Sequence, residues 1–200
     1  MSEQRSYQWY RQEIRRVLSA LDAVQGRFFA AWCAEFLVRE NRSKILLDHS
    51  VKEAEEIDGY ASEIWNSASG GAAFTTCRAN EIKARLLAVG PEDEVARIEV
   101  DNAATEALSC LWNAVEAQVD PSVELVALVS ENLVNALDYI ELNRPGDPYS
   151  LENMFEFPRM AEELRIQCEF IDNLKAGRPN SLVSRSVALG GRGSTGGNTT

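Results

Sequence analysis

The sequence predicts an all-α protein: a single compact bundle of about six to eight helices at residues 1–177, followed by a disordered tail at residues 178–200. Three observations lead to this prediction. Apolar residues recur at three- and four-residue steps along most of the chain, as on one face of a helix. No segment alternates apolar and polar residues as a strand does. A hydrophobic content of 45% in 200 residues is enough for the core of one globular domain.

The first two helices differ in their apolar pattern. The first has one apolar face, while Arg11, Arg15 and Arg16 lie on the opposite face; the apolar residues are Tyr7, Tyr10, Ile14, Val17, Leu18 and Leu21. The run at residues 28–38 is apolar on nearly all sides, which predicts a central buried helix that ends at Asn41.

The next two helices are delimited by caps and breakers. Residues 43–65 have helical periodicity with an expected interruption near Asp48–Ser50, and Gly70–Gly71 breaks the chain. Thr75 or Thr76 caps the following helix, and Gly90–Pro91 stops it. We expect Trp32, Trp65 and Trp112 to lie in the core, since each falls on an apolar stripe.

Three long helices complete the expected bundle. One begins at Asp93 or Val95 and ends at Gln118, and Asp120–Pro121 is a good start signal for the next. The expected inner face of that next helix comprises Leu125, Leu128, Val129, Leu133, Leu137 and Ile140, and residues 143–148 end it. The last helix carries apolar residues from Met160 to Leu174 and closes at Gly177 and Pro179.

The tail differs in composition from the bundle. From Arg178 onward it is rich in Gly, Ser, Thr and Asn, contains no acid, and carries three arginines, Arg178, Arg185 and Arg192. This low complexity predicts disorder. Residues 190–200 also have a composition typical of an artificial extension.

Charge is the most unusual property of the chain. Residues 92–172 contain nineteen carboxylates, four arginines and no lysine, a net charge of about −15 against −11 for the whole protein. We expect these acids on the solvated faces of packed helices, where they would attract a basic partner. The pI near 4.7 argues against nucleic-acid binding and against anionic membranes.

The residues show no reaction chemistry. His49 is the only histidine, and no Ser or Cys lies in a nucleophile motif around it. The four cysteines, Cys33, Cys77, Cys110 and Cys168, are too far apart for a local zinc pair, and the Glu-x-x-His pattern of a di-iron bundle is missing. We therefore expect no catalytic residue, metal or cofactor. Reduced cysteines and the lack of a signal or membrane-spanning segment predict a cytoplasmic location.

Several segments resemble a known family. RFFAAWCAEFLVREN at residues 27–41, DNAATEALSCLWNAVEA from Asp101, ELVALVSENLVNALDYIE from Glu124 and MAEELRIQCEFIDNLK from Met160 are similar to the YjaG-like bacterial family, domain of unknown function 416. The resemblance implies a compact, acidic helical bundle in a bacterial cytoplasm. It transfers no activity and no catalytic residues.

Charge and the missing chemistry lead to one hypothesis with two alternatives. The hypothesis is a non-enzymatic protein-binding module, in its most specific form an immunity-type protein that neutralises a basic bacterial toxin. The acids expected to be exposed for this partner are Glu131, Asp138, Glu141, Asp147 and Glu152. One alternative is an enzyme or metal-binding bundle whose carboxylates meet only in three dimensions. The other is a homo-oligomer joined through Trp9, Tyr10 and the first helix.

Overall fold

The computed structural model describes residues 6–89, 102–142, 150–178 and 183–185. Within these ranges the chain forms eight α-helices and one short 3-10 helix, and no strand is present among them. The predicted all-α bundle is therefore confirmed.

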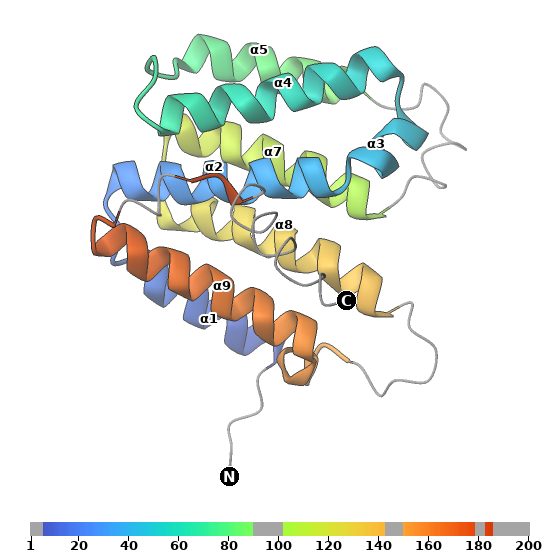
Figure 1. The fold of residues 1–200 in the computed structure, drawn as a ribbon. Helices are drawn as coiled ribbons and strands as arrows, with labels where there is room; N and C mark the ends of the chain where they lie inside the picture. The colour runs from blue at the N-terminus through green and yellow to red at the C-terminus, as the bar shows by residue number, and fades with distance from the viewer. Residues whose placement is uncertain (1–5, 90–101, 143–149, 179–182, 186–200) are drawn as a thin grey trace, which may run out of the picture.

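Three helices form the middle of the bundle and two pairs flank them. The middle helices are α2 (Ala23–Glu40), α7 (Asn102–Val119) and α8 (Val123–Leu142). On one side lie α4 (Val51–Ala68) and α5 (Thr76–Ala88); on the other lie α1 (Tyr7–Leu18) and α9 (Pro158–Lys175) (Figure 1). Two short elements complete the fold, α3 (Arg42–Asp48) between α2 and α4, and the 3-10 helix η1 (Met154–Glu156) before α9.

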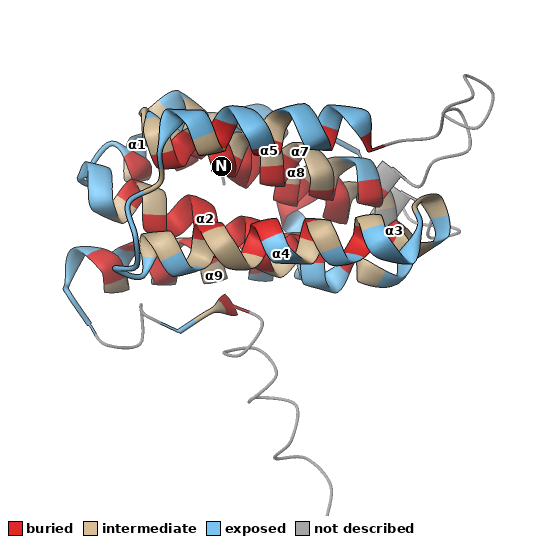
Figure 2. Ribbon diagram, turned by 90° about the horizontal axis from the view of Figure 1, so that it is seen from above, coloured by how far each residue is buried: buried red, intermediate tan, exposed pale blue. Residues whose placement is uncertain are grey.

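Helix α2 is the centre of the core, as its composition predicts. Asp22 caps its N-terminus. The Asp22 carboxylate accepts a hydrogen bond from the Gln25 amide at 2.9 Å, and the Gln25 side-chain oxygen accepts one from the Asp22 amide. Its small residues allow close packing: a Cβ on Gly26 would lie 3.5 Å from Val126. The buried residues, red in Figure 2, include α2 positions that face both flanking pairs. The helix ends at Asn41, as predicted.

The expected interruption between α3 and α4 is present. His49 is extended at the end of α3, and the Ser50 hydroxyl caps α4 by accepting a bond from the Glu53 amide. Thr75 caps α5, also as predicted. The turn before it requires glycine twice, because Gly70 has a φ of +96° and a Cβ on Gly71 would lie 2.6 Å from the Asn66 carbonyl oxygen.

Two predictions about α8 are wrong. The helix begins at Val123, and the Ser122 hydroxyl rather than Asp120 accepts a bond from the Leu125 amide at 3.4 Å. Of the predicted inner face, Val129, Leu133 and Leu137 are buried as predicted, but Leu128 is 39% exposed and Val126 is buried in addition. The leucine-rich composition of α8 makes several stripes equally apolar, and packing against α2 and α7 selects among them.

Several boundary predictions lie outside the described residues: the start at Asp93 or Val95, Gly90–Pro91, residues 143–148 and Pro179. The side chain of Ile140 does too. Of the three tryptophans expected in the core, Trp32 is 4% exposed, and Trp65 and Trp112 are partly buried against the core.

Candidate functional site

Glu131 does not belong to an exposed acidic face, and its prediction as an exposed residue is wrong. Its side chain is 5% exposed in the middle of α8. Arg15 Nη1 lies 2.6 Å from Glu131 Oε1, and Arg11 Nε lies 3.2 Å from Glu131 Oε2. Both arginines come from the face of α1 that the sequence places opposite its apolar stripe. Because α1 packs along α8, the buried carboxylate of Glu131 meets two arginines that stay partly exposed at the helix contact.

The other four acids proposed for partner binding lie at or beyond the C-terminal end of α8. Asp138 is half-buried, and Glu152 is exposed in the turn before η1. Glu141 lies in the last turn of α8, but its side chain is outside the described part of the chain, and Asp147 is outside it altogether.

Tyr7 brings the segment of Glu152 to this end of α8. The Tyr7 amide donates to the Leu151 carbonyl at 2.8 Å, and the Tyr7 hydroxyl donates to Asn135 Oδ1 at 3.1 Å. Asn135 lies one turn before Asp138 on α8. Tyr7 therefore links Leu151, which precedes Glu152, to α8, the helix that carries Asp138.

Carboxylates surround Tyr7. Burial raises the pKa of its hydroxyl above the ordinary value, and the charge of Glu131 raises it further. Arg11 opposes this effect, while Glu106 and Asp138 add to it. We define the acidic end of the bundle as Glu106, Asp138 and Glu152. These acids lie near Tyr7 and are distinct from Glu131, which is buried.

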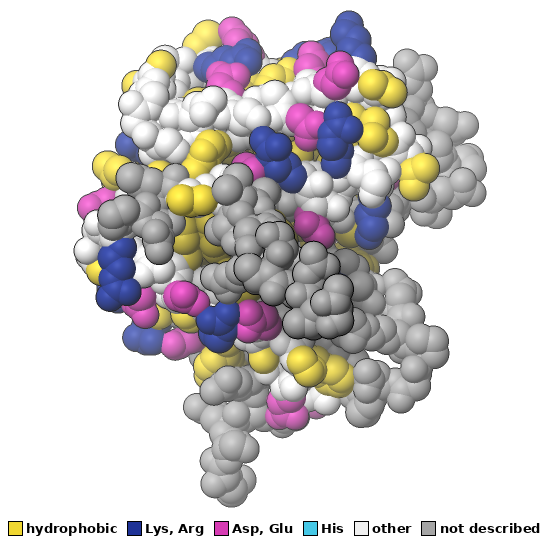
Figure 3. All heavy atoms as spheres, in the orientation of Figure 1, with side chains coloured by type: hydrophobic (Ala, Val, Ile, Leu, Met, Phe, Trp, Pro, Cys, Tyr) yellow, Lys and Arg dark blue, Asp and Glu magenta, His cyan; other side chains and the backbone are white. Residues whose placement is uncertain are grey.

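Among the other described acids of residues 92–172, several form ion pairs with bases. Glu162 and Glu169 both bind Arg165, at 2.7 Å each. Asp172 lies 3.3 Å from Lys175. On the face of the molecule drawn in Figure 3, acidic and basic side chains are interspersed. These paired acids therefore do not add to one broad acidic face, and the expected partner-binding surface is smaller than the sequence predicts.

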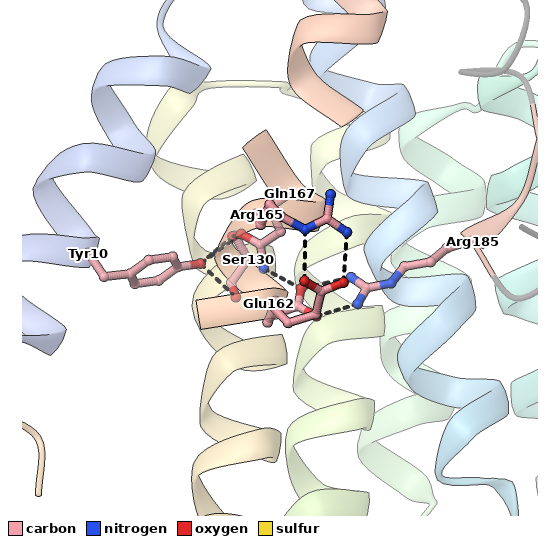
Figure 4. Close-up of polar contacts among 7 residues, drawn as sticks. Tyr10, Ser130, Glu162, Arg165, Gln167 and Arg185 are labelled. Carbon is pink, nitrogen blue, oxygen red and sulfur yellow. Dashed lines mark hydrogen bonds and ion pairs between the residues drawn. The ribbon is translucent and has the colours of Figure 1, made fainter. Parts of the chain in front are cut away.

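A chain of polar groups crosses the apolar core between α1, α8 and α9 (Figure 4). The Tyr10 hydroxyl lies 2.5 Å from Ser130 Oγ and 3.0 Å from Gln167 Oε1. Ser130 donates to Gln167 Oε1 at 2.6 Å, and Gln167 Nε2 donates to Glu163 Oε1 at 2.7 Å. Tyr10, Ser130 and Gln167 are fully buried and Glu163 is 4% exposed. Burial raises the pKa of Tyr10 well above its ordinary value. Tyr10 therefore packs inside its own bundle and cannot be the surface contact that the homo-oligomer alternative assigns to it.

Arg185 ends this chain of polar groups. Its side chain is 2% exposed, and its two terminal nitrogens donate to the two oxygens of Glu163, Nη1 to Oε1 at 2.8 Å and Nη2 to Oε2. The guanidinium carbon lies 3.9 Å from the ring centre of Phe36 and 4.8 Å from that of Trp32. Burial alone lowers the pKa of Arg185, but Glu163 outweighs this and the pKa is raised.

Sequence reasoning missed this network, although part of its signal is visible. Glu163 and Gln167 lie four residues apart on the apolar side of α9, where buried polar side chains need partners. Their partner Arg185 belongs to the segment predicted as a disordered tail. Most of that tail lies outside the described residues, and Arg185 shows that at least one of its side chains is packed in the core.

The cysteines are free thiols in the structure. Cys33 and Cys110 are buried, and burial raises the pKa of both. Cys77 is exposed. His49 follows the last residue of α3 and is half-buried, and its Nε2 has no hydrogen-bond partner in the described structure.

Two hollows flank the turn between α4 and α5. One, of about 360 Å³, contains Glu63 and Arg78, which bind each other at 2.7 Å and 2.8 Å. The other, of about 310 Å³, is lined by Arg27 and Gln118. Neither holds a catalytic pair. Over the described ranges, no three His, Cys, Asp or Glu side chains lie together as metal ligands would.

Comparisons with known proteins add no relative. The chain matches no family model, no curated protein and no solved structure. The resemblance to the YjaG-like family stays a prediction. No helix of the described chain is both long enough and apolar enough to span a membrane.

Proposed function

We propose that this chain is a non-enzymatic protein-binding module that binds a basic partner through the acidic end of the bundle. In its most specific form, the proposal is an immunity-type protein that neutralises a cognate basic bacterial toxin. The observation that supports it is that Glu106 and Asp138 both act on Tyr7 by their charge, while Glu152 follows the Leu151 carbonyl that the Tyr7 amide binds.

Two features strengthen the negative potential at this end. Neither α7 nor α8 contains a lysine or arginine, so their own side chains supply no compensating charge. The C-terminal end of α8 adds the partial negative charge of the helix dipole. A negative surface of this kind accelerates the encounter with a basic protein and disfavours acidic competitors.

The sequence predicts that Glu131 contacts the partner, but in this proposal Glu131 has a structural role instead. It is a positioning residue that holds α1 against α8 through Arg11 and Arg15. In this way it keeps Tyr7, and with it the Glu152 segment, beside Asp138. The partner meets Asp138 and Glu152.

The test is affinity capture from the native host at low ionic strength. The wild type is compared with a double variant, Asp138→Asn with Glu152→Gln. The control is Glu40→Gln with Glu55→Gln, which removes the same amount of charge from exposed positions on α2 and α4. We expect a basic protein that the wild type and control retain and the double variant loses, because exposed interface charges mainly set the association rate.

Co-expression then separates immunity from simple binding. Expression of the captured protein alone should arrest growth, and this chain should restore it. Capture of no basic protein, with none encoded beside the gene, would refute the proposal. If the double variant and its control lose the captured protein to the same extent, the assignment of the binding surface to Asp138 and Glu152 is refuted.

A further inference from the structure

Arg185 enters the core as a single side chain from a segment that lies on the surface. Val183, two residues earlier, is 38% exposed, while Arg185 is 2% exposed. Figure 4 shows the Arg185 side chain reaching from the C-terminal segment toward Gln167 and Ser130, and its guanidinium binds Glu163. The Arg185 side chain therefore lies in the core much as a bound ligand would, and not as one residue of a packed helix face.

The groups around the guanidinium are held by contacts within the helices. Glu163 is fixed by Gln167, which is in turn fixed by Ser130 and Tyr10. Trp32 is stacked on Phe170 with ring centres 3.8 Å apart and an angle of 6° between planes. Each group that touches the guanidinium thus has another contact within the helices.

The geometry is selective for a planar guanidinium. The two carboxylate oxygens of Glu163 match its parallel N–H groups, and the faces of Phe36 and Trp32 suit a flat, delocalised cation. An ammonium ion offers a point charge that cannot make the same paired contact. The contacts of the guanidinium are made by its two terminal nitrogens and its face, and its Nε has no hydrogen-bond partner among the described residues.

We propose that Glu163, Trp32 and Phe36 form a guanidinium-binding site that the chain's own Arg185 occupies and that an external guanidinium group can fill when Arg185 is removed. The ligand class is an alkylguanidinium, such as an arginine side chain. This site is independent of the acidic end and of the function proposed for it. Occupancy couples the C-terminal segment to the bundle, because Arg185 ties that segment to α9 and α2 together.

Chemical rescue tests the site. Arg185→Ala should lower the melting temperature by on the order of 10 °C, since it leaves a buried carboxylate without its cation. Ethylguanidinium at about 10 mM should then raise it by a few degrees in a saturable way, because a ligand stabilises the folded state it binds. Ethylammonium should have no such effect. Neither compound should stabilise the wild type, whose site is filled.

Two variants control for general effects. Arg178→Ala removes an exposed arginine whose side chain donates to Asn173 Oδ1, and ethylguanidinium should not stabilise this variant. Glu163→Gln in the Arg185→Ala background removes the carboxylate and should abolish rescue. If Arg185→Ala does not fold, the readout becomes refolding yield, which ethylguanidinium and not ethylammonium should restore. Absence of rescue in both readouts, or equal rescue by ethylammonium, overturns the proposal.

Discussion

At the scale of single residues, burial divides the carboxylates of residues 92–172 into groups with different roles. Glu163 and Glu131 are buried at 4% and 5% exposure, and each is bound to arginine. Glu162, beside Glu163 in the sequence, is exposed and binds Arg165. Adjacent residues of identical chemistry thus differ because α9 turns one toward the core and the other toward solvent.

This difference leads to a paired prediction. Glu163→Gln should destabilise the protein by about 3–5 kcal/mol, because it leaves Arg185 charged and buried without a counter-charge. Glu162→Gln should leave the free energy of unfolding nearly unchanged, since exposed ion pairs contribute little. Urea denaturation of the two variants measures both values. Similar free energies of unfolding for the two variants would contradict the assignment of Glu163 as a buried ion-pair partner.

At the scale of helices, caps define where elements begin. The Ser50 hydroxyl accepts from the Glu53 amide, and Glu53 accepts from the Ser50 amide at 2.9 Å. The Ser50 hydroxyl also donates to Glu53 Oε2 at 2.7 Å, and this bond, together with the one from the Ser50 amide, lowers the pKa of Glu53 below its ordinary value. The arrangement stops α3 and starts α4 within three residues, so the two helices can diverge.

Ser50→Ala should therefore cost about 1 kcal/mol of stability, the usual value of an N-cap. Ser69→Ala, at the exposed other end of α4, is the control and should cost much less. Because the pKa of Glu53 is lowered in the folded state, its contribution is present above the unfolded pKa and is lost as pH falls through the folded one. Melting curves should show the gap between wild type and Ser50→Ala shrinking from neutral pH to about pH 3. A gap that grows on acidification would contradict the capping role of Glu53.

At the scale of the whole molecule, the central helices protect the thiols that lie between the two flanking pairs. Cys33 of α2 and Cys110 of α7 are fully buried, and their pKa values are raised by burial. Cys77 is exposed at the start of α5. Reaction with a thiol reagent therefore distinguishes local exposure from opening of the entire bundle.

With Ellman's reagent at about pH 8, we expect Cys77 to react quickly, since the reagent can reach an exposed thiol directly. Cys33 and Cys110 should react only at the rate at which the bundle unfolds, and urea should accelerate them in proportion to global unfolding. A Cys77→Ser variant assigns the fast phase. Rapid labelling of Cys33 in that variant would show that the core opens locally.

The sequence by itself determined the local features of this protein. The buried character of α2, its end at Asn41, the break at Asp48–Ser50 and the Thr75 cap follow from neighbouring residues, because periodicity and capping act within a few positions. The tertiary structure alone decided which charges are buried. Arg11 and Arg15 reach Glu131 from the other end of the chain, and Arg185 reaches Glu163 from beyond the last helix. No local pattern records such pairs, since they depend on which helix faces pack together and on which side chains those faces enclose.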